Sequence, residues 1–151
     1  MKFIIIGRAD IDTIALDQPY AVISINTPSD TPAPYPEMPT LCVGLLRVEF
    51  ADAQEASNLV PEPWLFDETN ARGILEFARS VQDRAEVIVC QCDAGISRSS
   101  AVAGALSVLL NGSGSEGFAF NSARYAPNMR VYKSILETEH RLHIITPPPH
   151  P

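Results

Sequence analysis

The chain has 151 residues, enough for one domain with a sizeable hydrophobic core and too few for two ordinary domains. Apolar residues make up 46% of the sequence and charged residues 19%, a balance typical of globular rather than disordered proteins. The formal net charge of -7, with no cluster of Lys and Arg, argues against a nucleic-acid-binding surface. Every apolar run falls well short of the roughly 18 residues that a membrane-spanning helix needs, so we expect no membrane contact.

The opening segment and the cysteines indicate the compartment. Residues 1–7 are too short for the apolar core of a signal peptide and are better interpreted as a first strand. Without a secretion signal we predict a cytoplasmic protein, in which the odd count of Cys42, Cys90 and Cys92 need not pair. Cys90 and Cys92 lack the Cys-x-x-Cys spacing of zinc or redox sites, so we expect neither a metal nor a cofactor. Cys42 and Cys90 are interpreted as small core residues.

The first part of the chain predicts strands separated by loops. Short runs of β-branched or apolar residues predict strands over residues 3–6, 21–25 and 41–50. Residues 27–39 contain five prolines and are therefore expected to form a surface loop. A second loop is expected over residues 51–64.

The second part predicts helices around one strongly buried strand. Asp67 is placed to cap the first of these helices, in which apolar residues recur at helical spacing. Residues 86–91 form the clearest buried strand and lead directly into a helix that is apolar almost all round. The helices are expected over residues 68–82, 97–110, 116–123 and 128–141.

These elements predict a single α/β domain over residues 1–145. Its central, mostly parallel sheet should be flanked by helices, because a buried strand that leads into a buried helix is typical of this class. The proline-rich residues 146–151 are expected to form a disordered tail.

The segment after the buried strand carries the chemistry. A strand, a tight turn at Gly95 and a helix from about Ser97 would gather several backbone N–H groups around one point, which is the geometry of an anion site. The segment has neither the Gly-Lys-Ser/Thr ending of a nucleotide-binding loop nor the Gly-x-Gly-x-x-Gly of a dinucleotide site. Cys92 begins it and Arg98 follows after five residues.

Three side chains of this segment have predicted roles in catalysis. The helix dipole and the donated N–H bonds would stabilise Cys92 as a thiolate nucleophile. Arg98 can bind two oxygens of a phosphoryl group through its planar fork, which a lysine could not do. Ser99 can donate a hydrogen bond to the sulfur and help it leave when a cysteinyl phosphate is hydrolysed.

This pattern resembles the cysteine-based protein tyrosine and dual-specificity phosphatases, whose signature is His-Cys, five residues, Arg, then Ser or Thr. The small dual-specificity and prokaryotic members are the most similar. The resemblance extends loosely over residues 41–110, and it implies a phosphotyrosine phosphatase-like fold and a two-step reaction through phosphocysteine. The matching residues are Gln91-Cys92-Asp93-Ala94-Gly95-Ile96-Ser97-Arg98-Ser99-Ser100. Those expected to bind the substrate are Asp93, Ala94, Gly95, Ile96, Ser97 and Arg98.

The resemblance also implies a general acid, and it contains one departure. In the family the acid is an Asp on a loop before the catalytic strand. Asp52 looks like that residue; Asp67 is the alternative, although its position favours a helix cap. The family His before the nucleophile is Gln91 here, which can form hydrogen bonds but cannot carry charge.

Two other functions stay open at this stage. A rhodanese-like sulfurtransferase also uses a Cys in an anion-binding loop, although its loop is usually one residue shorter. A phosphate-binding pseudophosphatase is suggested by Gln91. For a phosphatase, the expected partner is a phosphoprotein or a small aryl phosphate, because the loop has no cation besides Arg98 to attract polyphosphorylated inositol groups.

Overall fold

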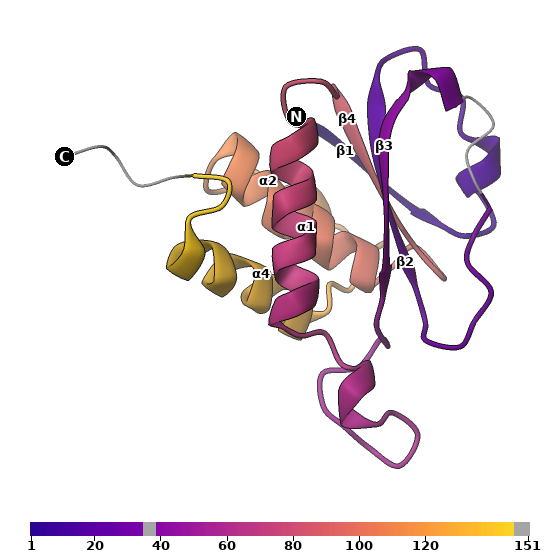
Figure 1. Ribbon diagram of the computed structural model, residues 1–151, viewed down its shortest axis with the longest axis vertical. Helices are drawn as coiled ribbons and strands as arrows, with labels where there is room; N and C mark the ends of the chain where they lie inside the picture. Colours follow the sequence, from indigo (N-terminus) through magenta and orange to yellow (C-terminus); the bar gives the residue numbers. More distant parts are fainter. Residues whose placement is uncertain (35–38, 147–151) are drawn as a thin grey trace.

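The computed structural model describes residues 1–34 and 39–146 (Figure 1). The tail expected over residues 146–151 lies outside the described part except for Thr146. The strands are β1 (Lys2–Gly7), β2 (Tyr20–Asn26), β3 (Cys42–Glu49) and β4 (Val87–Cys92). The α-helices are α1 (Glu68–Val81), α2 (Arg98–Asn111), α3 (Gly117–Phe120) and α4 (Met129–Leu142). Three short 3-10 helices, which the sequence reasoning missed, are η1 (Ile11–Thr13), η2 (Pro39–Leu41) and η3 (Glu62–Trp64).

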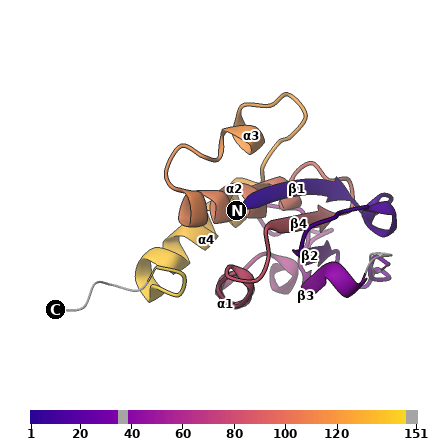
Figure 2. The same cartoon turned by 90° about the horizontal axis from the view of Figure 1, so that it is seen from above.

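The four strands form one sheet in the order β1-β4-β2-β3, and every pairing is parallel. Helices α1, α2 and α4 lie on one face of this sheet, and the loops that connect the strands cover the other face (Figures 1 and 2). The predicted α/β fold with a parallel sheet is therefore confirmed. Among the described residues, no helix is long and apolar enough to cross a membrane.

The strand sequences explain why both faces of the sheet are covered. Successive side chains of a strand point to opposite faces, and here both sets are apolar. In β4, Ile88 and Cys90 belong to the core under the helices, whereas Val87 and Val89 belong to a second core under the loops. Cys90 is fully buried, as predicted, but Cys42 is only half-buried because it begins β3, an edge strand.

The helices differ in how much of their surface is buried. α1 buries one face, and Asp67 caps it as predicted: the Asp67 carboxylate accepts from the Asn70 N–H at 3.0 Å, and Asn70 Oδ1 accepts from the Asp67 N–H at 3.0 Å. α2 is buried from Arg98 to Ser107 because it lies between the sheet and α4. The short helix expected over 116–123 is a single turn, α3, packed against α2.

Candidate active site

The carboxyl ends of the parallel strands bring distant residues to one edge of the sheet. Cys92 ends β4, while Arg8, Thr27 and Phe50 each follow the last residue of β1, β2 and β3. In open parallel sheets this edge is where ligands bind. The Cys92 loop, residues 92–98, lies at this edge and is contacted by residues from every strand end.

The turn of the Cys92 loop requires glycine. Gly95 has φ +70°, and a Cβ atom there would lie 2.5 Å from the backbone N of Gly7 and from the carbonyl carbon of Ile6. The loop is also tied to the end of β1, because the Arg8 N–H donates to the Asp93 carbonyl at 3.1 Å. The close approach of the two backbones fixes the position of the loop relative to the sheet.

The nucleophile predicted from the sequence lies at the base of this loop. Cys92 is 2% exposed, and its Sγ lies 3.1 Å from the hydroxyl of Ser99. Within the described chain, the backbone N–H groups of residues 94–98 donate to no other protein group. Ser97, the N-cap of α2, makes no side-chain capping bond, so the N-terminus of this helix stays open to an anion.

Arg98 is held in one orientation. Its side chain is 4% exposed. Nη1 donates to the Phe50 carbonyl at 2.7 Å and to Thr27 Oγ1 at 3.0 Å, and Nη2 donates to Asp93 Oδ2 at 3.0 Å. Nε is buried without a partner among the described residues. A buried unpaired donor costs about 1–3 kcal/mol, so this N–H is a natural contact for an anion.

Asp93 lies between two arginines. Its Oδ2 accepts from Arg98 and from the Thr27 hydroxyl, each at 3.0 Å, and its Oδ1 lies 3.7 Å from Nη1 of Arg8. The sequence reasoning missed Arg8, Thr27 and the Phe50 carbonyl. Their only signal was position, since each directly follows a strand that ends at the same edge of the sheet.

The structure brings Asp52 to the loop and keeps Asp67 away in the cap of α1. Asp52 Oδ1 accepts from Ser97 Oγ at 2.9 Å and from Asn128 Nδ2 at 3.0 Å. Asn128, the buried N-cap of α4, was not singled out from the sequence; it also donates its N–H to the Ser97 carbonyl at 3.0 Å. A cavity of about 440 Å³ adjoins this cluster, lined by Asp52, Ala53, Gln54, Ser97, Phe120, Ala126, Pro127, Asn128 and Met129.

Gln91, which replaces the family histidine, is fully buried and hydrogen-bonded. Its Oε1 accepts from the Ser24 hydroxyl at 2.5 Å, and Ser24 is its register partner on β2. Its Nε2 donates to the Cys92 carbonyl at 3.1 Å and, more weakly, to the Ile25 carbonyl at 3.4 Å. The amide therefore supports the backbone of Cys92, although it brings no charge.

The thiol of Cys90 does not take part in this site. Burial, and to a smaller extent the nearby Cys92, raises the pKa of the Cys90 thiol far above its ordinary value, so Cys90 stays a neutral core residue. Within the described ranges, no group of three or more His, Cys, Asp or Glu side chains could hold a metal ion.

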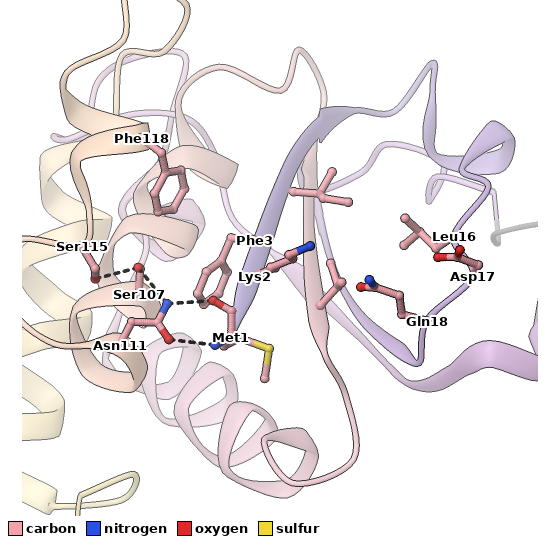
Figure 3. Close-up of a pocket in the computed structure, with 12 residues that line it drawn as sticks. Met1, Lys2, Phe3, Leu16, Asp17, Gln18, Ser107, Asn111, Ser115 and Phe118 are labelled. Carbon is pink, nitrogen blue, oxygen red and sulfur yellow. Dashed lines mark hydrogen bonds between the residues drawn. The ribbon is translucent and has the colours of Figure 1, made fainter.

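A second cavity, of about 510 Å³, lies at the opposite, amino-terminal end of β1 and β4 (Figure 3). Phe3 stacks on Phe118 beside it, with ring centroids 6.1 Å apart. Ser107, Ser115 and Asn111 form hydrogen bonds to one another on the same side. Its lining includes neither Cys92 nor Arg98.

The parallel sheet, the open start of α2 and the buried Arg98 together place hydrogen-bond donors that have no partner among the described residues at the carboxyl edge of the sheet. Solved structures of similar fold include dual-specificity phosphatases. A mouse putative dual specificity phosphatase complexed with zinc tungstate matches with a TM-score of 0.59 at 20% identity, covering 95% of this chain and 86% of that chain. PTPMT1 in complex with PI(5)P matches with a TM-score of 0.58 at 13% identity, covering 94% of this chain and 92% of that chain.

A third similar structure is the human tyrosine phosphatase-like serine/threonine/tyrosine-interacting protein, with a TM-score of 0.53 at 22% identity over 81% of this chain and 77% of that chain. No protein-family model matches the sequence, and no curated protein matches it either. The chain thus has the fold of the tyrosine and dual-specificity phosphatases, and the resemblance predicted from its sequence is confirmed at the level of the fold.

Proposed function

We propose that the chain is a cysteine-dependent phosphatase that hydrolyses phosphotyrosine or related phosphomonoesters through a phosphocysteine intermediate. The observation that carries this proposal is the set of hydrogen-bond donors in the loop that begins at Cys92. The N–H groups of residues 94–98 and the buried Nε of Arg98, none of which has a partner among the described residues, offer hydrogen bonds to an anion, with a thiol at the base of the same loop.

In the first step the Cys92 thiolate attacks phosphorus, an S–P bond forms and the ester O–P bond breaks. Arg98 and the loop N–H groups bind the equatorial oxygens as charge spreads over them in a loose transition state. In the second step water attacks the phosphocysteine and the sulfur leaves as a thiolate. Ser99 Oγ, 3.1 Å from the sulfur, stabilises that leaving thiolate.

Asp52 supplies the proton for the leaving oxygen in the first step and accepts one from water in the second. Both of its hydrogen-bond donors among the described residues, Ser97 and Asn128, bind Oδ1, which leaves Oδ2 to carry the proton. A general acid helps most when the leaving group is basic, as an aryl or alkyl oxide is at neutral pH.

The surroundings of the loop favour an aryl phosphate, free or on a phosphoprotein. Ile96 is 44% exposed on the loop. The cavity beside Asp52 is lined in part by the apolar residues Phe120, Pro127 and Met129. These side chains suit the aromatic ring of phosphotyrosine. We also propose that the chain is located in the cytoplasm. This proposal rests only on the odd number of cysteines, which need not pair in a reducing compartment.

A pseudophosphatase remains the second candidate because Gln91 lacks the charge of the family histidine. Against it, the Gln91 amide already donates to the Cys92 carbonyl. The sulfurtransferase alternative loses its support, since the loop has five residues between Cys92 and Arg98 and the similar folds are phosphatases.

Hydrolysis of para-nitrophenyl phosphate by the purified protein tests the proposal. Wild-type protein should release nitrophenol, and Cys92→Ser should not, while Cys92→Ser should still bind tungstate because the loop donors and Arg98 remain. Tungstate binding without turnover by the wild type would instead indicate a pseudophosphatase. Wild-type-like rates in Cys92→Ser would exclude the covalent mechanism.

A further inference from the structure

Asp93 is an unusual neighbour for a phosphate site because its carboxylate lies beside the arginine that would bind the phosphate. The two residues form an ion pair at 3.0 Å, in which the Arg98 side chain is 4% exposed and the Asp93 side chain 38% exposed. Arg8 approaches the other carboxylate oxygen at 3.7 Å. A carboxylate here repels a bound phosphate, so its presence in this position calls for a separate contribution to the site.

The contribution is the orientation of the guanidinium. Arg98 Nη1 is bound by the Phe50 carbonyl and Thr27, and Nη2 is bound by Asp93. Thr27 connects the two sides, since its hydroxyl donates to Asp93 Oδ2 and accepts from Arg98 Nη1. With these contacts made, Nε is the guanidinium nitrogen that has no protein partner within the described chain.

We propose that Asp93 is a positioning and specificity-determining residue of this site. Its carboxylate holds Arg98 so that the Nε–H is left for the phosphate, and its charge selects substrates with a single phosphate over substrates that carry further anionic groups beside it. This inference rests on the proposed phosphatase function and names the substrate class of that site.

The charge balance around the loop supports the selectivity. Among the described residues, the cations in contact there are Arg98 and Arg8, and both approach Asp93. In the form of the site that the proposed mechanism requires, Asp52 carries a proton, so the anions that oppose the two arginines are Asp93 and the Cys92 thiolate. The four formal charges cancel, so the recess offers one phosphate its N–H donors and its guanidinium but offers a second phosphate no net positive potential. Without Asp93 the same recess would carry an excess positive charge.

Two substitutions separate orientation from charge. Asp93→Asn keeps an oxygen that can accept from Arg98 and Thr27 but removes the charge, whereas Asp93→Ala removes both. Asp17→Asn is the control, because it changes the net charge of the chain equally at the other end of the sheet (Figure 3). For each protein, calorimetry gives the Kd of phosphate and of pyrophosphate, and steady-state kinetics gives kcat and KM for para-nitrophenyl phosphate.

We expect Asp93→Ala to lower kcat by about tenfold to a hundredfold, the scale of a small misplacement of a catalytic group, and Asp93→Asn to restore most of that loss. Wild type should bind pyrophosphate no more tightly than phosphate. Asp93→Asn should lower the Kd of pyrophosphate relative to the Kd of phosphate by about fivefold to tenfold, as expected for removing one nearby charge. Asp17→Asn should match the wild type in both measurements.

An unchanged kcat in Asp93→Ala would overturn the positioning role, and an unchanged ratio of the two Kd values in Asp93→Asn would overturn the specificity role. Failure of the proposed function has a different signature, namely a wild type that turns over no phosphate ester. In that case the two Kd values still decide whether Asp93 sets the anion preference of the loop.

Discussion

Asp52 and Ser97 are 45 residues apart in the chain and are joined by a hydrogen bond of 2.9 Å between Ser97 Oγ and Asp52 Oδ1. The bond connects the segment after β3 to the Cys92 loop and holds a carboxyl group at the edge of the proposed phosphate site. Asn128 holds the same oxygen from the start of α4. The relationship supports Asp52 rather than Asp67 as the general acid of the proposed reaction, and substitutions of the two residues can test this choice.

Asp52→Asn should slow turnover to an extent that depends on the leaving group. Loss of a general acid costs about 10²- to 10⁴-fold for a basic leaving group and much less for one that departs easily as an anion. Rates on phenyl phosphate should therefore fall more than rates on para-nitrophenyl phosphate. Equal defects on the two esters would mean that Asp52 is not the proton donor.

Asp67→Asn is the matched comparison for Asp52→Asn, because it makes the same chemical change in the cap of α1. Asn is also a good N-cap residue, so the free energy of unfolding should change little; Asp67→Ala should lower it by about 0.5–2 kcal/mol. Chemical denaturation and the same kinetic series measure both effects. A leaving-group dependence in Asp67→Asn would transfer the role of acid to Asp67.

Gln91→Leu should destabilise the protein and lower its activity. It leaves the Ser24 hydroxyl and the Cys92 carbonyl without their partner in a buried place, at a cost of about 1–3 kcal/mol for each unsatisfied group. Gln91→His should keep kcat close to that of the wild type, because the amide already supports Cys92. A large gain of activity in Gln91→His would contradict this interpretation. It would indicate that Gln91 lowers the activity of the wild-type protein.

Gly95→Ala should cost at least about 1 kcal/mol of stability from backbone strain alone, because its φ is +70°. The added Cβ would also meet Gly7 and Ile6 at 2.5 Å, so the loop must move and kcat should fall. Gly73→Ala is the control: it lies inside α1 with nothing within 4 Å of the new Cβ, and it should stabilise by about 0.5–1 kcal/mol. Thermal unfolding should give Gly95→Ala a melting temperature below that of the wild type and Gly73→Ala one above it. Equal melting temperatures for the two variants would refute the prediction.

The free energy of unfolding should fall as the pH rises above about 9. Burial raises the pKa of Cys90 from its ordinary value of 9.0, so the folded chain keeps this proton at a pH at which the unfolded chain releases it. The stability is complete below pH 9 and declines above it, by up to about 1.4 kcal/mol per pH unit for one group. Cys90→Ala should flatten this decline in denaturation experiments under reducing conditions at pH 8 and pH 10. An equally steep decline in Cys90→Ala would assign it to other groups, such as Tyr20, whose pKa burial also raises.

Much of the fold and part of the site were predictable because their signals are local. Apolar runs located all four strands, and the cap at Asp67 was visible in its own neighbourhood. The Cys92 loop was recognisable because its nucleophile, turn and arginine lie within a few residues of one another. The extents of these elements differed by only a few residues from the structure, except that α3 is shorter than expected.

The rest of the site depends on the order of the strands, which has no local signal. Arg8 and Thr27 meet at Asp93 only because β1 and β2 both lie next to β4. Asn128 reaches Asp52 because α4 packs across α1 and α2. The gathering of α1, α2 and α4 on one face follows from the same global arrangement, whereas the sequence predicted only that helices would flank the sheet.

The strand order has a consequence for how the chain acquires this structure. β1 and β2 follow each other in sequence but never pair, because β4 lies between them and pairs with both. A ribosome delivers β4 after the other three strands, so the sheet stays divided until the strand that ends at Cys92 is inserted. Pairings this distant in sequence close slowly. Cys92 is thus brought to its place by the step that completes the sheet, and a partly folded chain lacks the assembled candidate site.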